Sequence, residues 1–310
     1  MIGNEGRRTL SSLIVHAAAL ALALCAHGAA AARYIMPAED APLVGEVLVM
    51  NSKYEDTLAQ LAQRYGVGYR ELVDANPGVD PWIPGDGTPI VLPTEYLLPS
   101  GSRDGIVLNL AEYRLYYYLP SGAEVVTFPI GIGRSNYPTP QTDTRIVGRV
   151  RNPTWYPGES ARKEYAEEGR PLERAVPAGP DNPMGTMALI LGIKSYFIHG
   201  TNKPFGVGQQ ASFGCVRLYP DDIEDLAANV PNGTRVRIVD EPVKVAWVRG
   251  ELFLEVHKDL LERPSFSAVT QAITAALADS DAEVDWERAE EMARNANGIP
   301  GPILAKRQPR

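Results

Sequence analysis

The sequence predicts a mainly β protein that begins with a small strand–helix–helix–strand unit and ends in a helical tail. Its 26 prolines and 28 glycines fall in short groups between apolar runs, a distribution that favours a loop-rich, strand-based fold over a helical bundle. β-Branched and aromatic residues gather in short runs between residues 104 and 240, as strands require. Hydrophobic residues make up 45% of the 310-residue chain, which is enough to bury a core.

The first 32 residues have the three parts of a secretory signal peptide. Arg7 and Arg8 form a basic end, residues 10–26 are a short apolar stretch, and residues 29–32 offer cleavage sites of the Ala-x-Ala kind. A retained membrane anchor is the alternative, but the strongly apolar part is shorter than the ~20 residues of a stable span. We therefore expect residues 1–32 to be removed on export, leaving no membrane span. The Arg7–Arg8 pair is also compatible with export by the twin-arginine route.

The two cysteines have different expected fates. Cys25 lies inside the predicted signal peptide, and Leu24 stands where a lipoprotein signal would have a small residue, so Cys25 should leave with the peptide. The mature chain then has Cys215 as its single cysteine. A lone cysteine in an oxidising compartment cannot form an internal disulfide, so it is either a buried small hydrophobe or a reactive thiol.

Residues 44–93 are expected to form a compact module. Apolar residues at 58, 61, 62 and 65 follow the spacing of an amphipathic helix. The phrases DTLAQLAQRYGVGYRELVDANPGVD and IPGDGTPIVLP resemble a lysin-motif (LysM) carbohydrate-binding module. This resemblance implies binding to N-acetylglucosamine chains, whereas a helical connector without a ligand is the alternative. The expected elements are strands at 45–50 and 88–93 and helices at 57–65 and 69–75.

Residues 104–240 predict a second domain made mainly of strands, and residues 241–310 a helical extension with a disordered end. Between the strands, residues 152–187 are a Pro/Gly-rich insertion with a helical piece near 159–168, long enough to suggest a functional role. The expected elements are strands at 105–110, 113–118, 125–132, 144–151, 187–192, 196–199 and 235–239, and helices at 221–229, 265–277 and 284–297.

The residues suited to chemistry concentrate between positions 196 and 223. An apolar strand ends at His199, a glycine-rich loop follows, and Cys215 comes sixteen residues after the histidine. A thiol is only slightly ionised at neutral pH, so a nearby histidine can accept its proton and generate the nucleophile. Gly214 allows close backbone approach to a developing oxyanion. Arg217 offers a planar fork that suits a carboxylate, although pairing with Asp221 or Asp222 is the alternative.

This segment resembles the active-site stretch of the L,D-transpeptidase catalytic domain, written His-Gly, a loop, then Ser-His-Gly-Cys-(Ile/Val)-Arg. The matching residues are His199-Gly200-Thr201 and Ser212-Phe213-Gly214-Cys215-Val216-Arg217. The likeness extends to residues 179–185, 218–223 and 230–244. It implies a β-sandwich-like catalytic domain with Cys215 as nucleophile and His199 as base. Gly214, Ser212 and Gly200 would support the loop and the oxyanion, and Arg217 would bind a substrate carboxylate.

The resemblance also implies an activity. Such enzymes act on peptidoglycan tetrapeptide stems through a cysteine thioester, use no cofactor or metal, and tend to be acylated by carbapenems. The acceptor could be a diaminopimelate amine, which gives a wall cross-link, or a lysine of an outer-membrane protein, or water. The expected partners are stem peptides and glycan strands, and the expected location is the periplasm of a Gram-negative cell.

One departure from the family pattern weakens this assignment. Phe213 replaces the histidine that directly follows the serine, and a phenyl ring can neither carry a proton nor donate a hydrogen bond. A wall-binding scaffold without activity is therefore the competing reading. A papain-like protease is disfavoured because its cysteine precedes its histidine. The net charge of −8 gives no basic surface for nucleic acid.

Overall fold

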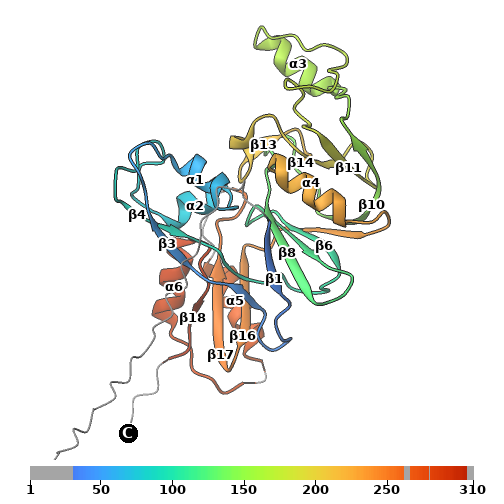
Figure 1. The fold of residues 1–310 in the computed structure, drawn as a ribbon. Helices are drawn as coiled ribbons and strands as arrows, with labels where there is room; N and C mark the ends of the chain where they lie inside the picture. Colours follow the sequence, from blue (N-terminus) through green and yellow to red (C-terminus); the bar gives the residue numbers. More distant parts are fainter. Residues whose placement is uncertain (1–30, 262–265, 279, 306–310) are drawn as a thin grey trace, which may run out of the picture.

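The computed structural model describes residues 31–261, 266–278 and 280–305 (Figure 1). The predicted disordered end at 306–310 and the first 30 residues of the predicted signal peptide lie outside these ranges. Ala32, the last residue of the predicted signal peptide, begins strand β1 (Ala32–Ile35). None of the helices in the described ranges is long and apolar enough to cross a bilayer.

The N-terminal module contains the expected strand–helix–helix–strand unit, formed by β3, α1, α2 and β4, and a second pair of strands, β2 and β5, flanks it. Thr57 caps the first helix through a reciprocal pair of bonds, in which the Gln60 backbone N–H donates to Thr57 Oγ1 at 3.2 Å and the Thr57 N–H donates to Gln60 Oε1 at 3.1 Å. Buried Leu58, Leu61 and Leu72 form its core. The elements are β2 (Leu43–Gly45), β3 (Leu48–Asn51), α1 (Leu58–Arg64), α2 (Tyr69–Ala75), β4 (Pro89–Leu92) and β5 (Glu95–Leu97).

The central domain confirms the mainly β prediction. Nine strands form one mixed sheet in the order β1-β8-β7-β6-β15-β10-β11-β12-β14. Its two halves and helix α4 contribute to a single apolar core, so the sheet curls around that helix. The elements are β6 (Gly105–Asn109), β7 (Arg114–Tyr118), β8 (Glu124–Pro129), β9 (Ile132–Gly133), β10 (Thr142–Arg151), α3 (Glu159–Glu167), β11 (Met187–Leu191), β12 (Phe197–His199), a 3-10 turn at Pro204–Gly206, β13 (Gln210–Ser212), β14 (Val216–Arg217), α4 (Pro220–Asn229) and β15 (Arg235–Val239).

The C-terminal extension corrects the expectation of a purely helical tail. Helices α5 (Phe266–Ala276) and α6 (Trp286–Asn295) lie close to the predicted ranges, but they pack on a three-stranded sheet. Strands β16 (Val243–Val248) and β17 (Glu251–Val256) form a hairpin that β18 (Gly301–Pro302) extends. Arg249 and Gly250 turn the hairpin with φ of 52° and 87°. Two-residue hairpin turns favour positive φ, but Arg-Gly is a weaker sequence indication than Asn-Gly.

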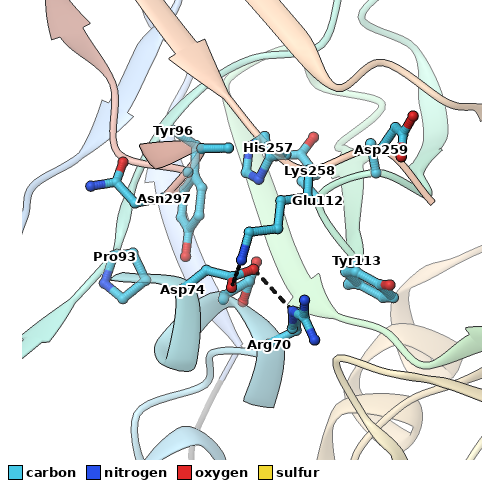
Figure 2. A pocket seen from close by; sticks show the side chains of 14 residues that line it. Arg70, Asp74, Pro93, Tyr96, Glu112, Tyr113, His257, Lys258, Asp259 and Asn297 are labelled. Atoms are coloured by element: carbon cyan, nitrogen blue, oxygen red, sulfur yellow. Dashed lines mark hydrogen bonds and ion pairs between the residues drawn. The ribbon is translucent and has the colours of Figure 1, made fainter. Parts of the chain in front are cut away.

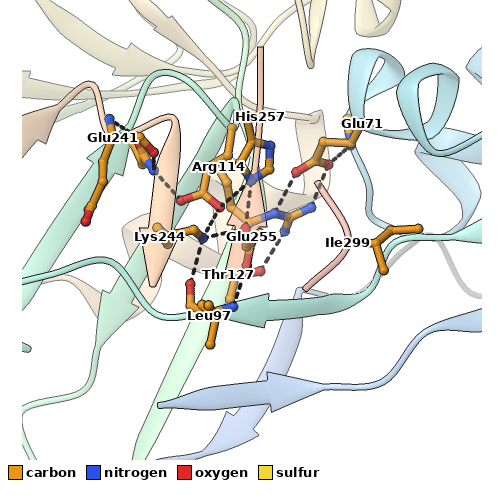
Figure 3. A network of polar contacts seen from close by, with 12 residues as sticks. Glu71, Leu97, Arg114, Thr127, Glu241, Lys244, Glu255, His257 and Ile299 are labelled. Atoms are coloured by element: carbon orange, nitrogen blue, oxygen red, sulfur yellow. Dashed lines mark hydrogen bonds and ion pairs between the residues drawn. The ribbon is translucent and has the colours of Figure 1, made fainter. Parts of the chain in front are cut away.

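Buried charges join the three units (Figure 3). The Lys244 ammonium of β16 lies 2.8 Å from the carboxylate of Glu112 in the central domain and 2.6 Å from that of Glu255 in β17. Arg114 of β7, whose side chain is fully buried, donates to both oxygens of Glu71 in module helix α2, at 2.8 and 2.7 Å. Because an unpaired buried charge costs several kcal/mol, these pairs favour one fixed arrangement of the units.

Asp222, in the first turn of α4, supplies a test of the packing. Burial raises the pKa of this carboxyl from an ordinary 3.8 to about 8, and its Oδ2 has no hydrogen-bond partner among the described residues. The folded state therefore holds the proton more tightly than the unfolded chain, so native stability falls as pH rises from about 4 to about 8.

We expect Asp222→Asn to remove this loss, because the neutral amide matches the protonated acid. The difference between the free energies of unfolding of the variant and the native protein should therefore increase, in favour of the variant, by about 1.4 kcal/mol per pH unit over that window. Urea denaturation at pH 4.5 and 7.5 measures the difference. Equal differences at the two pH values would contradict the buried-acid assignment.

Candidate active site

Strand pairing brings the predicted site residues to one face of the sheet. Strands β12 and β14 run parallel, with Ile198 opposite Val216 and His199 opposite Arg217. Ile198 and Val216 point into the central core. Because side chains alternate along a strand, His199 and Arg217 project on the other side, and Cys215 directly precedes β14. The structure thus gathers the three residues that the sequence places sixteen and two positions apart.

His199 is held as a neutral imidazole. Its Nδ1 lies 2.6 Å from the carbonyl oxygen of Gly200, which can only accept, so the ring proton sits on Nδ1 and Nε2 keeps its lone pair. Burial, assisted by the neighbouring Arg217 guanidinium, lowers the pKa of His199 to about 4. The imidazole is therefore unprotonated at Nε2 over the whole neutral range.

Cys215 is held as a neutral thiol. Its Sγ lies 3.8 Å from the carbonyl oxygen of Ser195, within reach of a weak S–H donor. Burial raises the pKa of this thiol above its usual value, although the Phe197 backbone and Arg217 act in the opposite direction. A neutral thiol and a neutral imidazole at this site fit proton transfer during attack, rather than a preformed thiolate–imidazolium pair.

The loop before Cys215 is fixed by short hydrogen bonds. Ser212 Oγ accepts from the Gly214 backbone N–H at 3.0 Å and donates to the Cys215 carbonyl at 2.5 Å. Thr139 donates to the Gly214 carbonyl at 2.9 Å. Gly214 has φ +105°, and a Cβ there would lie 2.9 Å from the Tyr196 ring. Ser212 and Gly214 therefore support the loop, and the Gly214 N–H is already engaged by Ser212.

Gly200 fits its place for a steric reason. A Cβ at this position would lie 3.0 Å from Ile223 Cγ2 of α4, so a larger residue would push the strand end away from the helix. Its carbonyl also orients His199. Gly200 thus sets both the position and the tautomer of the histidine.

An open cavity of about 840 Å³ borders the thiol loop. Arg217 and Phe213, each two residues from Cys215, line it, whereas Cys215 itself does not. Three buried lining atoms have no hydrogen-bond partner in the described part of the chain: Arg134 Nε, Arg217 Nε and Asn202 Oδ1. Arg217 also forms no ion pair with Asp221 or Asp222 there. A guanidinium in the wall of a cavity, such as that of Arg217, suits a carboxylate ligand.

Phe213 belongs to an aromatic and cationic cluster that sequence reasoning missed. The Arg134 guanidinium lies 4.4 Å from the centre of the Phe213 ring, and Tyr137 packs against that ring at 4.9 Å. Arg134 also binds both oxygens of Glu164 in α3, at 2.6 and 2.9 Å. Tyr165 of α3 lies 6.4 Å from Phe213. The phenyl ring therefore connects the active-site loop to the 152–187 insertion, a pairing that no local sequence pattern reveals.

The pKa shifts predict how the thiol should react. Because the Cys215 pKa is raised, the thiolate fraction at pH 6 to 8 is small and increases about tenfold per pH unit. Alkylation by iodoacetamide should therefore accelerate steadily across this range. A plateau beginning near pH 6 would indicate a preformed thiolate and would contradict the neutral pair.

A second group of polar residues, among them Glu112 and His257, lines a small pocket at the junction of the three units (Figure 2). Glu112, Glu255 and His257 bring possible metal ligands within 4.8 Å of one another. The ammonium of Lys244 already lies between the two carboxylates, at 2.8 and 2.6 Å, and supplies the positive charge that a metal ion would bring. We therefore interpret this cluster as a structural ion network.

Comparisons with known proteins show which family the chain resembles. The profile of the L,D-transpeptidase catalytic domain family (YkuD) matches residues 103–238. The chain is 41% identical over 290 residues to the probable L,D-transpeptidase ErfK/SrfK of Escherichia coli K12, covering 90% of this chain and 93% of that protein. It is 38% identical over 294 residues to the probable L,D-transpeptidase YbiS of the same organism, covering 92% and 96%.

A more distant relative is the putative L,D-transpeptidase YkuD of Bacillus subtilis, 28% identical over 194 residues, or 62% of this chain and 99% of that protein. With identities near 40% over almost the whole length of two relatives, the chain belongs to the L,D-transpeptidase family. The resemblance inferred from the His199 and Cys215 segments is confirmed at the level of the family.

Proposed function

We propose that this L,D-transpeptidase acts on peptidoglycan tetrapeptide stems through a thioester on Cys215, with His199 as base. The observation that carries the proposal is the β12–β14 register, which pairs His199 with Arg217, two residues after Cys215, beside a cavity that Arg217 lines. Family membership supports the general reaction.

In the first half-reaction, His199 Nε2 takes the thiol proton while Sγ attacks the carbonyl carbon of the third stem residue. The tetrahedral intermediate then collapses, and the C–N bond to the terminal D-alanine breaks. The departing amine takes the proton back from His199, which leaves a thioester on Cys215. Arg217 would hold the terminal carboxylate of the donor stem, and it would lose that contact when D-alanine departs.

In the second half-reaction, an acceptor amine attacks the thioester carbonyl and gives its proton to His199. The thiolate leaves and recovers that proton, so the enzyme returns to its starting state. A diaminopimelate amine would make a wall cross-link, and a lysine of an outer-membrane protein would anchor that protein. Attack by water would give a carboxypeptidase instead. Covalent catalysis divides the exchange into two lower barriers in each case.

The N-terminal module would bring the enzyme to its polymer substrate. Its exposed Trp82 and Ile83, which remain 60% and 71% accessible, offer apolar faces suited to sugar rings. These exposed side chains support the expected binding to N-acetylglucosamine chains. A periplasmic location after signal-peptide cleavage is part of the same proposal.

The competing function is a wall-binding scaffold. This alternative rests on Phe213, because a phenyl ring stands next to the thiol where the family pattern has a polar histidine. The ring's packing against Arg134 and Tyr137 favours the active enzyme, since it gives Phe213 a structural role that leaves His199 and Cys215 intact.

The test is incubation of the purified protein with a disaccharide tetrapeptide, followed by mass analysis of the products. A dimer that has lost one alanine indicates transpeptidation, and a disaccharide tripeptide indicates hydrolysis. The Cys215→Ala variant should give neither product. If the native protein also leaves the substrate unchanged but still binds wall glycan, the scaffold is the better account.

A further inference from the structure

We propose that the N-terminal module is a positioning element of the catalytic centre, because its helix α2 holds the 200–214 loop in the conformation that presents Cys215. This role is separate from binding glycan. It rests on the proposed function only in taking Cys215 as the reactive group.

The contact begins at the start of α2, whose first backbone N–H groups have no partner within the helix. The N–H groups of Tyr69 and Arg70 donate to the carbonyls of Val207 and Gly208, at 3.4 and 3.3 Å. The catalytic loop thus completes the cap of a helix that belongs to the module. At 3.3 to 3.4 Å these bonds are long, so they depend on the packing around them.

That packing requires two glycines in contact. Gly208 has φ +77°, and a Cβ there would lie 2.3 Å from the Tyr69 nitrogen and 2.6 Å from Gly68 Cα. A Cβ on Gly68 would in turn lie 3.0 Å from Gly208 Cα. On the outer side, the Phe205 ring packs against Tyr69 at 4.9 Å and Trp82 at 5.6 Å. The loop is therefore held by the module over several consecutive residues.

A backbone path leads from this contact to the thiol. The Gly208 N–H donates to the Ile130 carbonyl at 3.0 Å. The next residue, Gly131, exchanges two hydrogen bonds of 2.8 Å with Arg217, two residues after Cys215. Tyr219, just beyond β14, donates its hydroxyl to the Val67 carbonyl of the module at 3.2 Å. Displacing the module would therefore disturb the segment that follows Cys215 at two points, Arg217 and Tyr219.

A buried ion pair fixes the module in this place (Figure 3). Glu71 of α2 accepts from its own N-cap, the Gly68 N–H, and binds Arg114 with both oxygens. Arg114 is anchored by Thr127 at 2.6 Å and by the Tyr96 ring at 4.2 Å. Because separating the pair would leave a buried guanidinium without its carboxylate, the docked arrangement is strongly favoured.

The experiment compares four full-length proteins: the native chain, Gly208→Ala, Tyr69→Ala and Gly122→Ala. The control Gly122 has φ +69° but no atom within 4 Å of an added Cβ, so it shares the backbone strain without the clash. Cys215 is labelled with a carbapenem and, separately, with iodoacetamide from pH 6 to 9. Neither probe contains a sugar. Thermal unfolding midpoints identify any variant that is not folded at the assay temperature.

We expect Gly208→Ala to be acylated by the carbapenem at least tenfold more slowly than the native protein, with an altered pH profile of alkylation. Tyr69→Ala should be slowed several-fold, and Gly122→Ala should match the native rate within twofold. A loss of stability alone would leave the rates and pH profiles unchanged below the unfolding midpoint.

Native rates in both Gly208→Ala and Tyr69→Ala would overturn the proposal and leave the module as a glycan-binding unit. If Gly208→Ala fails to fold, Tyr69→Ala decides alone. If the carbapenem does not label even the native protein, the proposed function fails, while the alkylation profiles still test the positioning.

Discussion

His199→Ala should slow acylation of Cys215 by roughly 10² to 10⁴-fold, the usual contribution of a general base. The loss should be large because burial raises the Cys215 pKa, so little thiolate exists without a proton acceptor. The rate of acyl-enzyme formation with a tetrapeptide donor, followed by intact-mass spectrometry, measures it. The deficit should shrink as the pH rises, because hydroxide then removes the thiol proton.

His257→Ala is the matched control, since this histidine lies in the junction network, 2.7 Å from Glu255. We expect it to keep the native acylation rate at a temperature where it remains folded. Equal rates for the native protein and a folded His199→Ala variant would exclude His199 as the base.

Lys244→Ala should destabilise the fold by roughly 3 to 5 kcal/mol, the usual result of removing one partner from a buried ion network. The Lys244 side chain is 2% exposed, and both its carboxylate partners, Glu112 and Glu255, are fully buried. Although burial alone would raise the pKa of Glu255, Lys244 and His257 keep it below its usual value. Without Lys244 that carboxylate should take up a proton more readily, so the stability deficit should diminish at lower pH.

Lys258→Ala provides the comparison, because Lys258 lies 2.6 Å from Asp74 with a side chain that is 32% exposed. A partly exposed pair of this kind contributes up to about 1 kcal/mol. Urea denaturation of both variants at pH 5 and 7.5 gives the two free energies of unfolding. Similar losses for the two lysines would show that the buried network does not stabilise the assembly.

The sequence predicts those features whose cause is local. The spacing of Leu58 and Leu61 predicts α1, runs of β-branched and aromatic residues predict β6 and β7, and the motif around Cys215 predicts the candidate site residues. The same reasoning misses the hairpin of the C-terminal extension. Val243, Val245 and Trp247 alternate as a strand would, but the Arg249-Gly250 turn lacks a strong indication.

Contacts between distant segments could not be predicted. Glu71 and Arg114 are separated by 43 residues, and Lys244 and Glu112 by 132, so no periodicity connects them. Phe213 is read from the motif as a lost histidine, and its role as packing for Arg134 emerges only when α3 and the loop meet in space. The close contact of Gly68 with Gly208 is hidden for the same reason.

The most direct test of the central claim is intact-mass spectrometry of the native protein after exposure to a carbapenem, beside Cys215→Ala and Phe213→His. We predict a stable adduct of one carbapenem on the native protein, at a site mapped to Cys215, and none on Cys215→Ala. Labelling of Phe213→His alone, with none on the native chain, would contradict the account and indicate a wall-binding protein that has lost its activity.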